Sequence, residues 1–499
     1  MDVKDDEFVH GVLAVDLGAS SGRAIVGRLV HGKLELIEVH RFENQPVMMK
    51  DTYYWDFLRL FHEIKTSIAK AKEYHCISIG VDTWGVDFGL IDEKGRLLEN
   101  PVHYRDKRTQ GIMEECFLHL DKKRFYEITG IQFMELNTVF QLASLSKYQK
   151  QMLEKAETLL LMPDLINYML TGKKVCEYTI AATTQMLDAK ERVWSKEVLQ
   201  ALQIPNHLLL PIVPTGSYVG ELLECYTIEL EVPSCHVVAV AGHDTQCAMA
   251  AVPTLLEDFI FISCGTWSLL GTELNQPIVN ELSQRYNITN EGGYGGKISF
   301  LKNIIGLWLI QESRRQWKKE GFDYSYSQLE EFAKNEEPFL CLIDPDAPEF
   351  VAPGNIPKRI YEYSVRTNQK APKSIGAVVR CINESLALKY RYSLEQIKEC
   401  TKKDYQTIHV IGGGAQSKLL CQMTANACNM VVKAGPIEAT VLGNVAIQMI
   451  TSQAVKDINE ARGVIADSFE IITYTPKAFN DWEAAYQKFI RMMNDETFS

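Results

Sequence analysis

The sequence lacks the marks of several protein classes. Its 12 cysteines follow no paired spacing and form no C-x-x-C motif, and no cysteine–histidine cluster has the spacing of a zinc site. A chain of 499 residues can bury a large core without disulfides, so we expect reduced, mostly buried thiols. No uninterrupted apolar run is long enough to cross a bilayer, and the acidic start, residues 1–7, is unlike a signal peptide. We therefore expect a cytoplasmic protein with no membrane partner.

Positive charge is scarce relative to negative charge. The chain has 52 lysine and arginine residues against 64 aspartate and glutamate residues, a formal net charge of −12. Proteins that bind a nucleic-acid backbone usually present a basic stripe. The one dense basic run here is Arg314–Lys319, which we interpret as the solvated face of a helix. These charges predict no nucleic-acid partner, and 46% hydrophobic with 23% charged residues is typical of an ordinary globular protein.

What the sequence does contain is an alternation of strand and helix signals. Helical spacing of apolar residues predicts helices over 55–73, 375–400, 417–427 and 478–494, and a mainly helical region over 110–205. Apolar or alternating runs predict strands at 11–17, 22–30, 34–42, 77–81, 86–91, 236–241, 258–264, 267–274 and 409–411.

The order strand, glycine turn, strand occurs in both halves of the chain and is a weak sign of internal duplication. Pro253 breaks the pattern near 248–256. We predict a first domain at 1–250, a second at 251–475, and a C-terminal helix within 476–499 that could pack back on the first domain.

A glycine- and serine-rich turn follows the first predicted strand, in Ala14–Arg23. Glycine lets backbone N–H groups approach a phosphate closely, and serine hydroxyls add donors. Asp16, at the strand end, is placed to hold Mg²⁺ or its water shell. The alternative is a plain hairpin turn. The segment is neither a Walker A motif nor a G-x-G-x-x-G motif.

A second candidate site is Gly242-His243-Asp244-Thr245, which follows an apolar strand. A carboxylate on a loop just past a strand end can orient and deprotonate a hydroxyl for phosphoryl transfer. The alternative is that Asp244 only caps the next helix, 245–251.

Three further turns follow strands. Asp82-Thr83-Trp84-Gly85 offers an aromatic wall and a glycine for a sugar, or else a merely buried tryptophan. Gly265-Thr266 can donate to phosphates, and the glycines 412–414 let a base or ribose lie against bare backbone; tight strand–helix packing is the alternative for both.

These segments, in this order, resemble the FGGY family of carbohydrate kinases, which is related to actin and to the ATPase domains of heat-shock chaperones. The similar stretches span nearly the whole chain: AVDLGASSGR (14–23), GVDTWGVDFGLID (80–92), PVHYRDKRT (101–109), LLMPDLINYMLTGK (160–173), EYTIAATTQ (177–185), GHDT (242–245), SCGTWSLLG (263–271), NITNEGG (287–293), LKNIIGLWLIQ (301–311), HVIGGGAQ (409–416) and AGPIEATVLGNVAIQ (434–448).

The resemblance implies an α/β fold of two ribonuclease-H-like, actin-like ATPase domains, with mixed sheets flanked by helices and an active-site cleft between them. By position, Asp244 matches the catalytic base. The residues that match ATP-binding positions are Ala19, Ser20, Ser21, Gly22, Arg23, Thr266, Asn303, Gln311 and Gly413. Those that match sugar-binding positions are Gly85, His243, Asp244 and Thr245. Asp16 and Asp82 match acidic positions near the metal.

The implied reaction uses ATP and Mg²⁺ to phosphorylate O1 of L-rhamnulose, a step of L-rhamnose catabolism. Two alternatives remain. The substrate is another ketose, such as L-fuculose or L-ribulose, or the chain is a nucleotide- or sugar-binding module that has lost catalysis. The implied partners are the sugar and ATP alone, with the chain a monomer or weak homo-oligomer.

Overall fold

A computed structural model describes residues 11–494, and the chain divides into two compact units. Unit 1 draws its described residues from 1–255, 274–300 and 439–468, and unit 2 from 256–273, 301–438 and 469–499. Each unit is therefore assembled from separated stretches of sequence. None of the helices in the described part is both long enough and apolar enough to span a membrane. The twelve cysteines are free thiols, and ten of them are buried.

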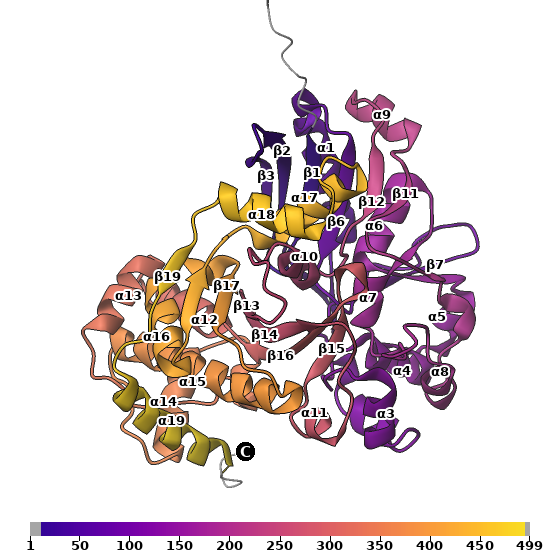
Figure 1. Cartoon of the computed structure of the whole chain (residues 1–499). Coiled ribbons are helices and arrows are strands. Elements are labelled where there is room, and N and C mark those ends of the chain that lie inside the picture. Colours follow the sequence, from indigo (N-terminus) through magenta and orange to yellow (C-terminus); the bar gives the residue numbers. More distant parts are fainter. Residues whose placement is uncertain (1–10, 495–499) are drawn as a thin grey trace, which may run out of the picture. The chain divides into compact units, whose positions relative to one another are not determined.

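A six-stranded mixed sheet forms the centre of unit 1, with the order β11-β12-β6-β1-β2-β3 (Figure 1). β1, β6 and β12 run parallel, and β2, β3 and β11 are antiparallel to their neighbours. Their bounds are β1 Val12–Leu17, β2 Ser21–Val30, β3 Lys33–Glu43, β6 Ser78–Thr83, β11 Ser217–Glu221 and β12 His236–Ala239. The strands predicted at 11–17, 22–30, 34–42, 77–81 and 236–241 are confirmed.

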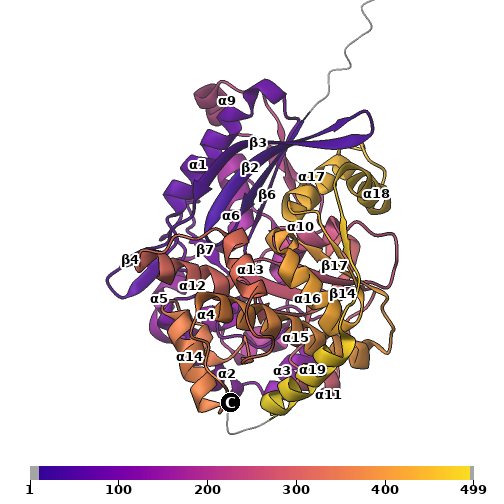
Figure 2. The same ribbon diagram turned by 90° about the vertical axis from the view of Figure 1, so that its left-hand side faces the viewer.

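Helices cover both faces of this sheet (Figure 2). One face packs on α1, Phe57–Lys70, the predicted amphipathic helix, whose Leu60 and Ile64 join Leu13 and Val15 in one buried cluster. The other face packs on α17, Ala439–Thr451, which contacts both β1 and β6. α18, Ile458–Ser468, follows α17 and contacts β3. Because side chains alternate along a strand, even-numbered residues of β1 and β6 face α17.

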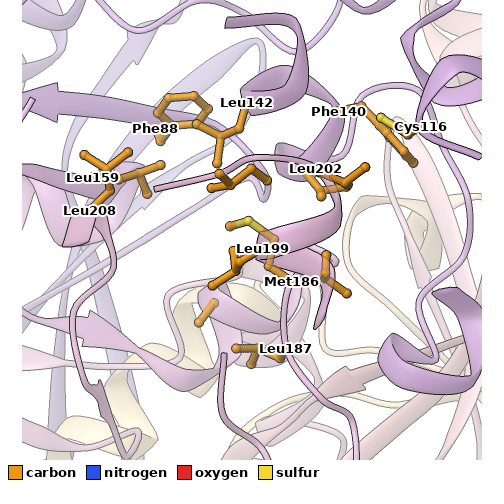
Figure 3. Close-up of a cluster of buried hydrophobic side chains, with 14 of the residues drawn as sticks. Phe88, Cys116, Phe140, Leu142, Leu159, Met186, Leu187, Leu199, Leu202 and Leu208 are labelled. Carbon is orange, nitrogen blue, oxygen red and sulfur yellow. The ribbon is translucent and has the colours of Figure 1, made fainter. Parts of the chain in front are cut away.

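The remainder of unit 1 is largely helical, as predicted for 110–205, and has its own apolar core (Figure 3). Its residues come from distant turns of chain, for example Phe88, Phe140, Leu199 and Leu202. The bounds are α2 Ile112–Phe117, α3 Lys122–Thr129, α4 Thr138–Tyr148, α5 Lys150–Lys155, α6 Met162–Thr171, α7 Tyr178–Ala182, α8 Lys196–Ala201, α9 Glu224–Leu230, α10 Asp244–Ala250 and α11 Glu281–Arg285. Short strands are β4 Val47–Met49, β5 Thr52–Tyr54, β7 Phe88–Ile91, β8 Thr158–Leu161, β9 Cys176–Glu177, β10 Ile212–Val213 and β15 Thr289–Gly292.

Unit 2 is built on a mixed sheet in which β16, β14, β13, β17, β18 and β19 are successive neighbours. The strand bounds are β13 Ile260–Cys264, β14 Trp267–Leu274, β16 Ile298–Ile305, β17 Thr407–Ile411, β18 Val431–Ala434 and β19 Ile472–Tyr474. The helices are α12 Trp308–Lys319, α13 Tyr326–Lys334, α14 Ile356–Arg366, α15 Ile375–Thr401, α16 Lys418–Cys428 and α19 Phe479–Asn494. Mixed sheets flanked by helices in each unit confirm the predicted α/β fold class.

The C-terminal region of the chain differs from the expected arrangement. From the sequence, the helix within 476–499 could pack back on the first domain, but α19 belongs to unit 2, where Trp482 and Phe489 pack with Leu388 of α15 and Met423 of α16. The returning segment is instead 439–468, with α17 and α18. α17 presents a glycine where it meets α10, whereas α19 buries Trp482 and Phe489 in an apolar cluster of unit 2.

Gly443 of α17 allows a close approach to α10. A Cβ atom at Gly443 would lie 1.7 Å from the carbonyl oxygen of Cys247 in α10. We therefore expect Gly443→Ala to force the helices apart and to lower the free energy of unfolding by about 3 kcal/mol or more. Urea denaturation of the purified variant measures this change.

Gly463→Ala in α18 is the matched control, because a Cβ there meets no atom within 4 Å. In the middle of a helix this substitution should be neutral or stabilise the protein by about 0.5–1 kcal/mol. Equal stability of Gly443→Ala and the wild type would contradict the packing argument.

Candidate functional site

Two aspartates lie side by side at the carboxyl ends of neighbouring parallel strands in unit 1. Asp16 of β1 is in register with Asp82 of β6, and both point to the face that packs on α17. The carboxyl end of a parallel sheet is where α/β folds bind ligands. The structure therefore brings the two predicted acidic residues together at such an edge.

Asp16 is also paired with the arginine at the far side of the glycine- and serine-rich turn. Arg23 lies opposite Asp16 in the β1–β2 hairpin, and its Nε and Nη2 atoms are 2.9 and 2.8 Å from Asp16 Oδ2. Asn44 holds the turn from outside, donating its side-chain amide to the carbonyl of Gly18 at 2.9 Å. Ser20 and Ser21 are exposed. The turn is thus a hairpin, as in the plain alternative, and its two serines are nonetheless accessible to a ligand.

Asp82 is fully buried, and a polar network from α17 holds it. Asn444 Nδ2 donates to Asp82 Oδ2 at 2.6 Å, Gln448 Nε2 donates to Asn444 Oδ1 at 2.7 Å, and Ser78 Oγ donates to Gln448 Oε1 at 2.6 Å. Burial raises the pKa of Asp82 well above its usual value, and the nearby Asp16 charge raises it further, against the donor from Asn444. Within the described residues, Asp82 Oδ1 has no hydrogen-bond partner.

Asn444 and Gln448 were missed as functional candidates by sequence reasoning. Both fall in the segment 434–448, which carried the family resemblance without any role for these two side chains. Their spacing of four places both on one helix face, which was the available signal. Which strand that face meets depends on the tertiary fold.

The loop that carries His243 and Asp244 is fixed to the sheet and to the helical region. The Thr83 amide at the end of β6 donates to the Gly242 carbonyl at 2.9 Å. On the other side, the Gly242 amide donates to Glu177 Oε2 at 3.0 Å, and the His243 amide donates to Thr179 Oγ1 at 3.3 Å. Every backbone amide of 242–243 therefore has a defined partner.

The carboxylate of Glu177 accepts several hydrogen bonds that hold this loop. Its carboxylate accepts from the amides of Thr179 and Ile180, capping α7, from the Gly242 amide, and from the hydroxyl groups of Thr179 and Thr215. Burial raises the pKa of Glu177, and these donors oppose the rise. Glu177 lies in the segment 177–185, which contributed to the family resemblance, but no role is predicted for this side chain from the sequence.

Asp244 is the first residue of α10, and His243 is the N-cap without a side-chain capping bond. The capping alternative for Asp244 is therefore not what the structure shows. Its Oδ1 atom accepts from the amide of Thr245 at 2.6 Å and lies 3.2 Å from the Thr245 hydroxyl. The side chain keeps 30% of its surface exposed, which leaves it accessible to a substrate. Desolvation raises the pKa of Asp244, His243 opposes the rise, and Asp16 adds to it.

The sequence allows two interpretations of the loop 82–85, a sugar site or a turn with a buried tryptophan, and its residues differ in which interpretation they fit. Trp84 is buried, and its Nε1 donates to Asp87 Oδ2 at 3.0 Å, while Trp55 donates to the same oxygen at 2.6 Å. Trp84 is thus a packed core residue, as in the alternative interpretation. Gly85 is partly exposed, and a Cβ there would lie 3.1 Å from Thr183, so the loop approaches α7 closely.

Unit 2 places several of the predicted nucleotide-binding residues around its sheet. Thr266, in the turn between β13 and β14, donates its hydroxyl to Gln311 Oε1 of α12 at 3.3 Å. The Leu307 amide binds the Gly265 carbonyl at 3.0 Å, which ties the start of α12 to this turn. Asn303 is partly buried on β16. The structure therefore brings Thr266 and Gln311 together.

Two of the three glycines after β17, Gly413 and Gly414, differ in whether packing requires them to be glycine. A Cβ at Gly414 would lie 2.2 Å from the Cys264 sulfur, so this position requires glycine for packing. A Cβ at Gly413 would meet nothing within 4 Å, so packing does not require glycine there. Gly413 is the position assigned to ATP by the resemblance. Ser417, which follows, caps α16 and donates to Glu330 at 2.6 Å.

The described residues contain no cluster of three or more His, Cys, Asp or Glu side chains arranged to hold a metal ion. Asp16 and Asp82, the two predicted metal ligands, have no third side chain of these types in the described part of the chain placed to complete such a cluster.

Comparison with known proteins covers both halves of the chain. The family model described as "FGGY family of carbohydrate kinases, N-terminal domain" matches residues 11–251, and the corresponding C-terminal domain model matches 260–452. A rhamnulokinase of Oceanobacillus iheyensis is 42% identical over 93% of this chain and 97% of its own length. One of Bacteroides thetaiotaomicron is 42% identical over 95% and 98%, respectively.

Solved structures share the fold. The xylulose kinase of Lactobacillus acidophilus superposes with a TM-score of 0.79 at 15% identity, covering 97% of this chain and 98% of that one. The ADP complex of Plasmodium falciparum glycerol kinase gives 0.78 at 14% identity, covering 98% and 99%.

The Asp82 network generates a pH-dependent stability prediction. Asn444→Asp replaces the donor to Asp82 with a second carboxyl group, so the folded protein must hold a proton that the unfolded chain releases. We expect a loss of about 1–3 kcal/mol at pH 7. Because the folded state binds more protons than the unfolded state, the deficit should grow as the pH rises and shrink toward pH 5. Urea denaturation at several pH values measures it.

The matched control is Asn459→Asp, an exposed position near the start of α18, where an added acid is well tolerated. Its stability should stay within about 0.5 kcal/mol of the wild type. A pH-independent deficit for Asn444→Asp would count against the proposed link between Asn444 and the Asp82 carboxyl.

Proposed function

Because this chain belongs to the FGGY family of carbohydrate kinases, we propose that it transfers the γ-phosphoryl group of ATP to O1 of L-rhamnulose, giving L-rhamnulose 1-phosphate and ADP. The observation that carries the choice of sugar is the similarity, over more than nine-tenths of the chain, to proteins named rhamnulokinase. We assign the step to L-rhamnose catabolism and propose a cytoplasmic location, where ATP is supplied. We propose a monomer or weak homo-oligomer with no macromolecular partner.

In the proposed reaction, Asp244 is the general base. It orients the O1 hydroxyl and accepts its proton as O1 attacks the γ-phosphorus, while the bond from that phosphorus to the β–γ bridging oxygen breaks and ADP leaves with the electron pair. The exposure of Asp244 and its position at the start of α10, on a loop anchored by Thr83 and Glu177, support this role. His243, Thr245 and Gly85 are the proposed sugar contacts beside it.

Each unit has residues that we assign to binding the nucleotide. In unit 1, we assign phosphate binding to Ala19, Ser20, Ser21, Gly22 and Arg23, a turn whose serines are exposed. In unit 2, we assign ATP contacts to Thr266, Asn303, Gln311 and Gly413. The Thr266–Gln311 contact and the open space at Gly413 are consistent with a ligand surface.

The residues of unit 1 fit a Mg²⁺ ion that arrives with ATP. The buried Asp82 Oδ1 lacks a hydrogen-bond partner among the described residues, and the Asp16 carboxylate lies beside it in register. Mg²⁺ typically takes one or two carboxylates together with waters and phosphate oxygens. Asp16 and Asp82 would hold it, and when bound it neutralises charge on the phosphates.

The substrate assignment is tested by measuring ADP release with Mg·ATP and a panel of ketoses. We expect kcat/KM to be highest for L-rhamnulose because the chain is 42% identical over more than nine-tenths of its length to proteins named rhamnulokinase, and phosphorus NMR should place the phosphate on O1. A higher value for L-fuculose or L-ribulose would keep the kinase and replace the sugar. Absence of sugar-dependent release with every ketose would favour the binding-module alternative.

The base is tested by Asp244→Asn. Removing the proton acceptor should lower kcat by roughly 10²–10⁴-fold while the protein stays folded. Asp121→Asn, which changes an exposed helix cap of α3, is the control and should keep full activity. Near-normal turnover of Asp244→Asn would remove Asp244 from the mechanism.

A further inference from the structure

A buried glutamate next to the proposed base has no assigned role. Glu291 lies on β15 in the segment 287–293, and its side chain is 8% exposed. A carboxylate is costly to bury unless it is paired. Its partners therefore indicate why a charged residue occupies this position.

Two side chains from the loop and helix of the proposed base converge on one oxygen of Glu291. His243 Nδ1 lies 3.3 Å from Glu291 Oε2, at ion-pair distance, and Gln246 Nε2 of α10 donates to the same oxygen at 3.2 Å. Gln246 is fixed in turn, because its Oε1 accepts from Ser299 Oγ at 2.7 Å. Gln246 therefore holds Glu291 by a hydrogen bond, whereas His243 Nδ1, which has no hydrogen-bond partner among the described residues, meets the same oxygen as an ion-pair contact.

The other ring nitrogen of His243 faces the proposed base. His243 Nε2 lies 3.5 Å from Asp244 Oδ1. The imidazole ring, 11% exposed, therefore spans two carboxylates, one of which is accessible and one buried. A carboxylate oxygen near each nitrogen favours the form of the ring that carries a proton on both nitrogens.

We propose that Glu291 is a positioning residue of the kinase reaction, which fixes the ring of His243 so that its Nε2–H group faces Asp244 and orients the carboxylate that receives the sugar proton. This inference rests on the proposed role of Asp244. It resembles the general arrangement in which a buried carboxylate sets the orientation of a histidine next to the reacting group.

The electrostatic setting of the ring agrees with this assignment. Burial alone would lower the pKa of His243, but Glu291, Asp244 and Glu177 together raise it above its usual value. Among the described residues, these three carboxylates have the largest charge effects on the ring, and they come one each from β15, α10 and β9. Glu177 already accepts four backbone or hydroxyl donors on its Oε2 atom, so Glu291 is the carboxylate left to pair with the far side of the ring.

The test compares Glu291→Gln with Glu291→Asp and with Ser299→Ala, the full-length protein being used throughout. Glu291→Gln keeps the shape and removes the charge. We expect kcat to fall by up to about 100-fold through misplacement of Asp244, with KM for ATP unchanged. Glu291→Asp should recover part of the loss, because it restores a carboxylate. Ser299→Ala weakens the same network beyond Gln246 and should leave kcat within a few-fold of the wild type.

Nitrogen NMR of the imidazole groups, assigned by comparison with His243→Gln, gives a readout independent of turnover. In a pH titration, the form of His243 with a proton on both ring nitrogens should persist to higher pH in the wild type than in Glu291→Gln, because the neighbouring carboxylate charge is lost in the variant. Equal kcat losses for Glu291→Gln and Ser299→Ala, or a His243 signal unchanged by Glu291→Gln, would overturn the inference. If Glu291→Gln does not fold, Glu291→Asp is compared with Ser299→Ala in the same two measurements. A loss of kcat for Glu291→Asp no larger than that for Ser299→Ala would then overturn the inference.

Failure of the proposed function is distinguishable from failure of this inference. A wild type without sugar-dependent ADP release, or an active Asp244→Asn variant, would reject the proposed function itself. A wild type that is active and depends on Asp244, combined with full activity of Glu291→Gln, would reject only the role of Glu291.

Discussion

Unit 1 depends on the burial of several carboxylates within one small region. Asp82 and Glu177 are almost wholly removed from water, and Asp16 and Glu291 are nearly so. Isolated charges in such surroundings are strongly unfavourable, so each must be paired or protonated. The structure provides a different partner for each: Arg23 for Asp16, Asn444 for Asp82, backbone and hydroxyl donors for Glu177, and His243 for Glu291.

These pairings connect segments that are far apart in the sequence. The donor to Asp82 stands 362 residues downstream, on a helix that rejoins unit 1 after the chain has built most of unit 2. Gly443 lets that helix approach α10, and thereby the loop of His243 and Asp244, without steric conflict. Packing and electrostatics are therefore inseparable here, because the glycine contact places the asparagine that compensates the buried charge.

The arrangement suits phosphoryl transfer, in which a protein contributes chiefly positioning and charge stabilisation. Asp244 keeps contact with solvent, whereas the groups that hold its loop are buried. When the groups that hold a base are rigid, the base loses little conformational entropy on binding a substrate, since its orientation is already fixed. Burial raises the pKa of Asp82 and of Asp244, and the Asp16 charge adds to both shifts, whereas the pKa of His243 is raised by neighbouring acids against the effect of burial.

The sequence by itself determined the local structure and the individual candidate residues. Apolar periodicity located β1–β3, β6, α1, α15 and α19 to within a few residues, and strand-end motifs singled out Asp16, Asp82 and Asp244, because these signals depend only on neighbouring residues. It could not identify Asn444, Gln448, Glu177 or Glu291 as parts of the site, and it indicated 476–499 rather than 439–468 as a segment that could return to the first domain. Only the tertiary structure decided those points. A side chain that acts through a distant partner leaves no periodic pattern in the sequence. Both α17 and α19 also have apolar faces, and the surface against which each face packs depends on the fold.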